Sequence, residues 1–291
     1  MSVKENPDEI LKSHWLKKGS VRVGNIIGSG GFGRVYAGWY NGLKVAIKDY
    51  GVIYEDLNWE DKMDIMEEFQ LMKDLNHTNV VRVYGFIMNR GCIALVMEYA
   101  NRGSLKRFIE KKSFRCNVWL QYHVLLQIAL AMRFIHNEII LHRDLKPDNV
   151  LVFQDKTSNY VIKISDFGES RVSLSKYFPT VFSGPFFQQR CESVRRSLTK
   201  GKGTFTYMDK AAVKYGNNMA TDFYSFCVLA SEVLCGQLIP VIPHLDALMK
   251  RENPTIPENV PKELRDCLMS GFEEDQQKRS DWTNTIIALR K

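Results

Sequence analysis

The first hundred residues alternate between short apolar runs and glycine-containing turns. The runs "VRVGNII" from residue 21, "GRVYAGWY" from 33 and "LKVAIKDY" from 43 place β-branched and aromatic residues at alternating positions. This period of two is typical of strands with one buried face. Two further runs, "VVRVYGFI" from 80 and "CIALVMEY" from 92, have the same character. The pattern therefore predicts a small β-sheet.

Two longer segments are predicted to be helices instead. Residues 58–76 place Ile65, Phe69 and Met72 on one stripe, which predicts a helix packed on the sheet. Residues 118–138 are apolar nearly all round, as expected of a helix inside a larger body. The composition changes near Glu98–Gly103. We expect a lead-in over 1–20 with a short helical pattern, followed by a small sheet-containing part and a larger helical one.

Composition and charge narrow the classes of function. The chain has 291 residues, 45% of them hydrophobic and 25% charged, as is usual for globular proteins. Its net charge of +7 favours anionic partners such as nucleotides. Charge alone does not predict nucleic-acid binding, since most basic proteins of this size are simply basic, and we expect none.

Cysteine spacing and apolar segments indicate the cellular compartment in which the protein is expected. The six cysteines form no CxxC pair, so no spacing indicates a zinc or redox site. The N-terminus lacks an apolar signal core, and the longest apolar stretch, "FCVLASEVLCGQLIPVI", is interrupted by Glu232 and Pro240. We therefore expect no transmembrane segment, and an intracellular, cytoplasmic setting with free thiols.

The stretch "LHRDLKPDNVLV", residues 141–152, is too densely charged to be core. It is expected to be a loop that holds charges in a fixed arrangement. Together with "ISDFGES" at 164–170 it supplies an acid that can accept a proton, a cation and two oxygen ligands: Asp144, Lys146, Asn149 and Asp166. This set suits a hard divalent cation that carries phosphates.

Two features nearer the N-terminus fit the same chemistry. The glycines of "IGSGGFGRV", residues 27–35, lie between strands, where they would let the backbone approach a phosphate; glycine hairpins without a ligand are also common. A strand follows the glycines, which excludes a Rossmann motif. Lys48 lies in an apolar strand, either snorkelling to solvent or buried with a carboxylate partner. Glu68 shares the apolar stripe of the 58–76 helix and is the candidate partner.

In this order the motifs resemble the signature of the eukaryotic protein kinase family. They are the glycine-rich loop at 28–33, "VAIK" at 45–48, "HRDLKPDN" at 142–149 and "DFG" at 166–168. The resemblance runs from about residue 21 to 290. It implies an α+β, two-lobed fold: a kinase domain at 21–291, with a small antiparallel sheet and one helix at 21–98, a hinge at 99–103 and a larger, mainly α-helical lobe at 104–291.

The resemblance also implies ATP and Mg²⁺ as cofactors and assigns roles to residues. Lys48 would hold the α- and β-phosphates and pair with Glu68, Asp144 would accept the substrate's proton, Lys146 would neutralise the γ-phosphate, and Asn149 and Asp166 would hold magnesium. ATP would be enclosed by Ile27, Gly28, Ser29, Gly30, Gly31, Phe32, Gly33, Arg34 and Val35 over the phosphates, and by Val35, Ala46, Met97, Glu98, Ala100 and Leu151 around the adenine. The stretch "TDFYSFCVLASEVLCG", residues 221–236, resembles the family's central helix. Asp222 within it would tie that helix to the charged loop.

The substrate is expected to be a protein with a serine or threonine acceptor. Lys146 within "DLKPDN", and "GTFTY" at 203–207, with Thr204 facing Asp144 and Lys146, resemble the serine/threonine-specific pattern. "LVMEYANRGSL" and "DFYSFCVLASEVL" resemble the tyrosine-kinase-like branch, which includes Raf and mixed-lineage kinases.

The chain departs from the family in two places. Asp209, Lys210 and Ala211 stand where the family has Ala-Pro-Glu, whose Glu pairs with a buried Arg that Arg279 resembles. Either Asp209 or Asp281 compensates, or Arg279 is more exposed. The segment from Asp166 to Met208 is also long. Phosphorylation within 180–204, by an upstream kinase or by autophosphorylation, would order it through Arg143; the alternative is a solvated insert.

Two other classes of function are open. A pseudokinase would use the fold as a nucleotide-binding scaffold or interaction module, and only the replaced Ala-Pro-Glu favours it. A small-molecule phosphotransferase of similar fold would typically lack the Lys two residues after the catalytic Asp, which is present here as Lys146.

Overall fold

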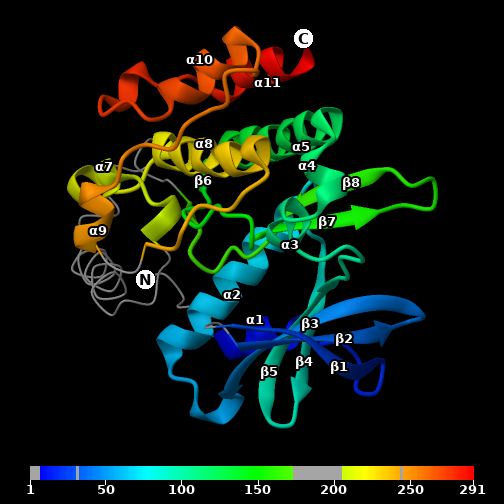
Figure 1. Ribbon diagram of the computed structural model, residues 1–291. Coiled ribbons are helices and arrows are strands. Elements are labelled where there is room, and N and C mark those ends of the chain that lie inside the picture. The colour runs from blue at the N-terminus through cyan, green and yellow to red at the C-terminus, as the bar shows by residue number, and fades with distance from the viewer. Residues whose placement is uncertain (1–6, 31–32, 173–204, 243–244) are drawn as a thin grey trace.

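The computed structural model describes residues 7–30, 33–172, 205–242 and 245–291. These residues form two lobes, with an antiparallel sheet in the smaller lobe and mainly helices in the larger one (Figure 1). The predicted α+β, two-lobed fold is therefore confirmed.

The sheet of the small lobe has the strand order β1-β2-β3-β5-β4, and every neighbouring pair is antiparallel. Its central strand β3 carries apolar side chains on both faces. Val45 and Ile47 pack on one face with residues of β5, while Ala46 faces the main core. Because side chains alternate along a strand, Lys48 shares the face of Ala46. The strands are β1 Val21–Gly30, β2 Gly33–Tyr40, β3 Leu43–Ile53, β4 Val83–Asn89 and β5 Cys92–Glu98.

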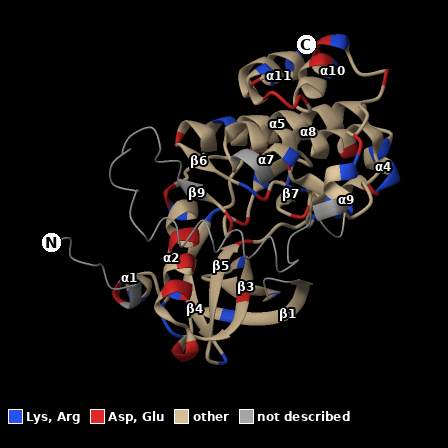
Figure 2. Ribbon diagram, turned by 90° about the vertical axis from the view of Figure 1, so that its left-hand side faces the viewer, with Lys and Arg blue, Asp and Glu red and all other residues tan. Residues whose placement is uncertain are grey.

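Helix α2, Trp59–Asp74, lies against this sheet and carries acidic residues on its outer side (Figure 2). It begins at Asn58, whose side chain accepts a hydrogen bond from the amide of Asp61, as expected of an N-cap. The inward stripe is Ile65, Glu68, Phe69 and Met72. Glu68 is therefore an acid on an otherwise apolar face.

The lead-in is joined to the small lobe. Helix α1, Pro7–Ser13, places Leu11 in the core with no exposed surface. The chain that follows it runs beside β4, where Leu16 donates its amide hydrogen to the carbonyl of Phe86, and Phe86 donates to the carbonyl of His14. Leu11 and these backbone bonds tie residues 11–16 to the sheet.

The large lobe is built around two long helices, α5, Val118–Asn137, and α8, Met219–Cys235. Nearly all of α8 is buried, and it begins with a capping box in which Asn218 and Thr221 bond each other's backbone. Within the described ranges, α5 is the one helix long and apolar enough to cross a membrane. It packs here against α8 and α11, so its composition follows from its place in the core.

Shorter elements complete the large lobe. Two small antiparallel strand pairs, β6 Ile140–Leu141 with β9 Arg171–Val172 and β7 Val150–Gln154 with β8 Tyr160–Ile164, flank the charged loop. Among the described residues, the other helices of the large lobe are α3 Leu105–Ile109, α4 Lys112–Arg115, α7 Lys210–Tyr215, α9 Leu245–Lys250, α10 Lys262–Ser270 and α11 Trp282–Arg290, with 3₁₀ turns η3 Phe205–Tyr207 and η4 Gln276–Lys278. A further 3₁₀ turn, η1 Tyr54–Asp56, lies in the small lobe between β3 and α2.

Candidate active site

Three charged side chains meet where the two lobes face each other. The ammonium group of Lys48, on β3, lies 2.8 Å from a carboxylate oxygen of Glu68 on α2 and 2.8 Å from one of Asp166, which follows β8. Lys48 is 9% exposed and Glu68 5%, so the snorkelling alternative for Lys48 is wrong. The predicted Lys48–Glu68 pair forms, and Asp166 joins it.

The electrostatics of this cluster favour the charged forms of Lys48 and Asp166 but not that of Glu68. Burial alone would lower the pKa of Lys48, but the two carboxylates outweigh it and raise the pKa well above its usual range. Burial would raise the pKa of Asp166, yet Lys48, His142 and Lys146 hold it below its ordinary value. For Glu68, burial dominates and raises the pKa, with Lys48 opposing the shift. Asp166 is therefore an ionised oxygen donor, as a divalent cation requires.

Tyr50 is a member of this cluster that the sequence motifs did not reveal. Its hydroxyl donates to the second carboxylate oxygen of Glu68 at 3.0 Å, and its ring lies 5.2 Å from the ammonium of Lys48. Burial and the neighbouring carboxylate raise the pKa of Tyr50, so it stays protonated and can donate. The available signal was its position two residues after Lys48, on the same face of β3.

The charged loop comprises residues 142–149 and folds around Asp144. The ends of the predicted loop, Leu141 and residues 150–152, lie in strands β6 and β7 instead. The ammonium of Lys146 lies 2.6 Å from a carboxylate oxygen of Asp144, and the amide of Asn149 donates to the same oxygen at 2.8 Å and to the Asp144 carbonyl at 2.9 Å. Ser165, one residue before Asp166, donates to the carbonyl of Asn149. The four residues that the sequence grouped are thus held in one network of adjacent segments.

Asp222 fixes the backbone of this loop through two hydrogen bonds. In the first turn of α8, its two carboxylate oxygens accept hydrogen bonds of 2.8 Å from the amides of His142 and Arg143. Arg143 has a φ of 68° and Asp166 one of 63°, a region that non-glycine residues rarely adopt. Such strain persists where surrounding contacts determine the backbone, and Asp222 supplies them at Arg143.

The glycine loop joins β1 and β2. Gly28 pairs with Val35 and Gly30 with Gly33, so the hairpin closes as predicted; Gly31 and Phe32 lie outside the described residues. Gly33 has a φ of +108°, and a Cβ there would lie 2.0 Å from the carbonyl oxygen of Asp49. Among the described residues, a Cβ at Gly28 would meet nothing closer than Val35, at 3.9 Å. Glycine at position 33 is therefore required by the backbone conformation and by the nearby strand, whereas neither constraint applies to position 28.

The residues expected around the adenine lie on facing elements. Ala46 on β3 is the register partner of Met97 on β5, and both side chains are buried. Val35, on β2, and Leu151, on β7, are partly buried against the same core. The side chain of Glu98 is turned to Lys163 in an ion pair, and its backbone amide donates to the carbonyl of Arg82.

Comparison with known proteins decides the family. The family model described as protein tyrosine and serine/threonine kinase matches residues 21–289.

The chain belongs to this protein kinase family.

Several kinases with curated names are similar to it. A mitogen-activated protein kinase kinase kinase of Drosophila melanogaster is 27% identical over 96% of this chain, and the serine/threonine-protein kinase STY46 of Arabidopsis thaliana is 26% identical over 93%. The probable serine/threonine-protein kinase gdt2 of Dictyostelium discoideum is 28% identical over 82%. The chain spans 23%, 44% and 14% of the lengths of these relatives.

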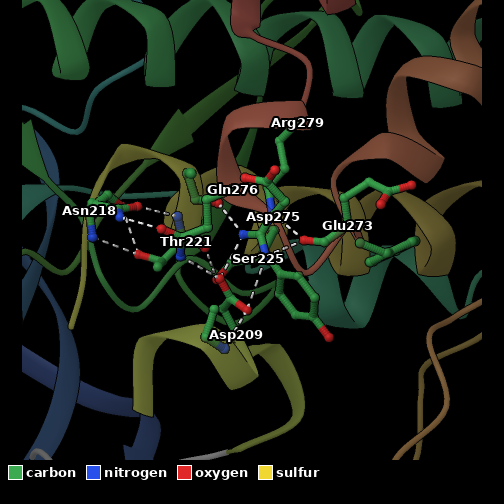
Figure 3. Close-up of polar contacts among 12 residues, drawn as sticks. Asp209, Asn218, Thr221, Ser225, Glu273, Asp275, Gln276 and Arg279 are labelled. Carbon is green, nitrogen blue, oxygen red and sulfur yellow. Dashed lines mark hydrogen bonds and ion pairs between the residues drawn. The ribbon is translucent and has the colours of Figure 1, made fainter. Parts of the chain in front are cut away.

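This kinase keeps a buried ion pair where its Ala-Pro-Glu motif is replaced. Asp209, the N-cap of α7, accepts a 2.6 Å hydrogen bond from the guanidinium of Arg279, and both side chains are 2% exposed. Figure 3 shows Asp209 pointing at Arg279 with Gln276 beside them. Asp281 instead caps α11 by accepting from Asn284. Of the alternatives left open by the sequence, Asp209 compensates, and Arg279 is not exposed.

Arg279 is held by more than this carboxylate. It also donates to the carbonyls of Ala220 and Glu273, while Asp209 accepts from the amide of Ala211. Through Asp209 and Arg279, the start of α7 is therefore joined to α8 and to the loop before η4. The expected role of Thr204 and the expected phosphorylation within 180–204 lie outside the described residues, so both stay predictions, as does the phosphate-binding role of Arg143.

Proposed function

We propose that this kinase transfers the γ-phosphate of ATP to serine or threonine hydroxyls of protein substrates. The observation that carries the proposal is the convergence of Lys48, Glu68, Asp166 and the Asp144 network at the junction of the lobes. Segments that are up to 118 residues apart supply these groups. An intracellular setting, where ATP is available, is part of the same proposal.

Each residue's role follows from its chemistry. Lys48, held by Glu68, would bind the α- and β-phosphate oxygens. Asp144 would accept the proton of the attacking hydroxyl, and Lys146, whose ammonium lies 2.6 Å from Asp144, would neutralise charge on the transferred phosphoryl group. Most of the catalytic effect would come from positioning and electrostatic stabilisation.

The donor set fits magnesium. Asp166 is an ionised carboxylate and Asn149 offers an amide oxygen, both hard oxygen ligands. These two residues would hold the metal, which supplies charge neutralisation at the phosphate oxygens when bound. The backbone of Gly28 to Val35 would cover the phosphates, while Ala46, Met97, Leu151 and the backbone at Glu98 to Ala100 would contact the base.

Three observations support serine/threonine kinase activity over the alternatives. The similar kinases named above include serine/threonine-protein kinases of two organisms, and Lys146 stands two residues after Asp144, where small-molecule phosphotransferases of similar fold typically lack it. The Asp209–Arg279 ion pair supplies the carboxylate that the replaced Ala-Pro-Glu motif would have provided. That pair argues against the scaffold alternative.

The test is phosphate transfer from labelled ATP to a generic basic protein in the presence of magnesium. Lys48→Met and Asp144→Asn should each lower kcat at least about 100-fold, because a lost general base or phosphate-binding cation removes a factor of that order. Lys262→Met, at an exposed surface pair with Asp266, is the matched control and should keep full activity. Signal that survives in both site variants would contradict the proposal, and phosphotyrosine as the product would contradict the serine/threonine assignment.

A further inference from the structure

A buried chain of hydrogen bonds connects the last helix to the charged loop. The indole N–H of Trp282, the first residue of α11, donates to Nδ1 of His136 at 2.8 Å. On the other side of the ring, Nε2 of His136 lies 2.9 Å from a carboxylate oxygen of Asp222. The three side chains come from α11, α5 and α8, and none is more than 7% exposed.

The donors and acceptors of these three side chains permit only one arrangement of protons. An indole nitrogen can only donate, so Nδ1 of His136 must present its lone pair to Trp282. The proton of the neutral imidazole then lies on Nε2, from which it donates to Asp222. The other tautomer would oppose two N–H groups at Nδ1 and set a lone pair against a carboxylate at Nε2. Trp282 therefore selects the tautomer that suits Asp222, as the second partner of a histidine generally does.

Asp222 depends on that donor. Burial alone would raise its pKa, but the hydrogen bond from His136 leads the groups that hold the pKa below its ordinary value, so the carboxylate is ionised. In that state Asp222 has acceptor capacity for His136 and for the amides of His142 and Arg143 together. Asp144 follows immediately in the chain.

The aromatic packing of Trp282 does not explain why its indole N–H points at Nδ1 of His136. Trp282 packs edge-on against Phe223 and Phe226, with centroids 5.1 and 5.2 Å apart. A phenylalanine at position 282 would keep much of that apolar contact. It would not provide the N–H that points at Nδ1.

We propose that Trp282 and His136 are positioning residues for phosphate transfer, acting through Asp222 on the backbone of residues 142–144. Trp282 fixes the tautomer of His136, His136 satisfies the buried carboxylate of Asp222, and Asp222 holds the strained backbone at Arg143 that aims Asp144. The inference about catalysis rests on the proposed function, whereas the assignment of the tautomer does not.

The first experiment needs no activity. Long-range ¹H–¹⁵N NMR of the histidine-labelled wild-type chain reports which ring nitrogen carries the proton, and a His136→Gln spectrum assigns the signal. The expected result is a neutral His136 protonated at Nε2, with Nδ1 of the lone-pair type. A proton on Nδ1, or on both nitrogens near neutral pH, would overturn the proposal.

The second experiment compares Trp282→Phe with Phe223→Leu. Phe223→Leu removes an aromatic ring that packs on Trp282 and keeps the indole donor, whereas Trp282→Phe keeps an aromatic ring and removes the donor. We expect Trp282→Phe to speed hydrogen exchange of the Arg143 amide and to lower kcat, each by about threefold to tenfold, as for one buried hydrogen bond, with little change in the KM for ATP. Phe223→Leu should change exchange and kcat less than Trp282→Phe does.

These readouts separate the two proposals. Equal effects of both variants, or no effect of Trp282→Phe on amide exchange, would overturn the positioning role. A wild-type chain that shows the expected tautomer and exchange pattern but transfers no phosphate would instead contradict the proposed function and leave the structural chain intact.

Discussion

The hydroxyl of Tyr50 binds Glu68 on the carboxylate oxygen that Lys48 does not use, at 3.0 Å. Residues 48 and 50 are successive positions on one face of β3, so a single strand holds both oxygens of the same carboxylate. Helix α2 is thereby tied to the sheet by two bonds. The orientation of Glu68 is fixed, and with it the position of Lys48.

Tyr50→Phe should weaken this tie. The variant keeps the ring and removes the hydroxyl, so Glu68 loses a donor in a buried place, at an expected loss of about 1–3 kcal/mol in the free energy of unfolding. Activity should fall about fivefold to tenfold in kcat/KM for ATP as α2 loosens. Tyr40→Phe, on β2 and away from the cluster, is the control for tyrosine truncation. Unchanged stability and kinetics for Tyr50→Phe would show that this hydrogen bond contributes to neither stability nor activity.

Breaking the Asp209–Arg279 pair should be strongly destabilising. Asp209→Asn leaves the Arg279 charge buried at 2% exposure without its carboxylate, and such changes lower the free energy of unfolding by about 3–5 kcal/mol. Adding Arg279→Gln to Asp209→Asn removes the stranded charge and should recover part of the loss. Denaturant unfolding of the two single variants and the double variant measures the coupling. Additive effects of the two substitutions would mean that the pair is not coupled.

Glu232 should make stability depend on pH. Burial, partly opposed by hydrogen bonds from Ile239 and Tyr207, raises its pKa from 4.5 to about 7. Between these values the folded chain binds more protons than the unfolded chain, so the contribution of Glu232 to stability falls as pH rises from about 4.5 to about 7. The free energy of unfolding should fall by on the order of 3 kcal/mol over this window, since a tenfold change in proton affinity corresponds to about 1.4 kcal/mol.

Glu232→Gln isolates this effect, because the amide does not titrate. Unfolding free energies of both proteins should be measured at several pH values between about 5 and 8.5, a range that spans the raised pKa. The wild type minus Glu232→Gln difference should fall with rising pH across the window and level off above it. A difference that is flat, or that rises with pH, would contradict the assignment.

Leu11→Ala tests whether the lead-in helix is part of the folded small lobe. Leu11 has no exposed surface, and truncating such a residue lowers the free energy of unfolding by about 2–5 kcal/mol. Lys12→Ala, at an exposed position of the same helix, should change it by less than about 0.5 kcal/mol. Equal, small effects for both variants would place the domain boundary near residue 21, where the sequence pattern predicts it.

The sequence predicted best those features that repeat locally. The strands of the small lobe and helix α2 follow from period-two and period-3.6 patterns. Helix α5 follows from a long apolar segment, and α8 from an apolar run that resembles the central helix of the family. The run from residue 80 was an instructive exception: β4 begins at Val83, while Val80 and Val81 are buried against Ile164 of the large lobe. The apolar signal was real, but it served a contact between lobes.

What could not be predicted depends on partners far away in the chain. Asp209 and Arg279 are 70 residues apart, and His136 and Trp282 are 146 apart. Nothing in the local pattern distinguishes Asp209 from Asp281 as the partner, or marks a tryptophan as a donor. Helices as short as α4 and strands as short as β6 carry too few residues to show a period at all.

Gly33 sets a limit on how the glycine loop can be probed. An alanine there would drive its methyl group into the Asp49 carbonyl and distort the β2–β3 pairing, so an inactive Gly33→Ala protein would report damage to the sheet. No described residue comes as close to a Cβ at Gly28, where the nearest atom is the Cβ of Val35 at 3.9 Å. An alanine at Gly28 would therefore test the proposed nucleotide contact, whereas an alanine at Gly33 would test the architecture of the sheet, even though both glycines belong to the same consensus.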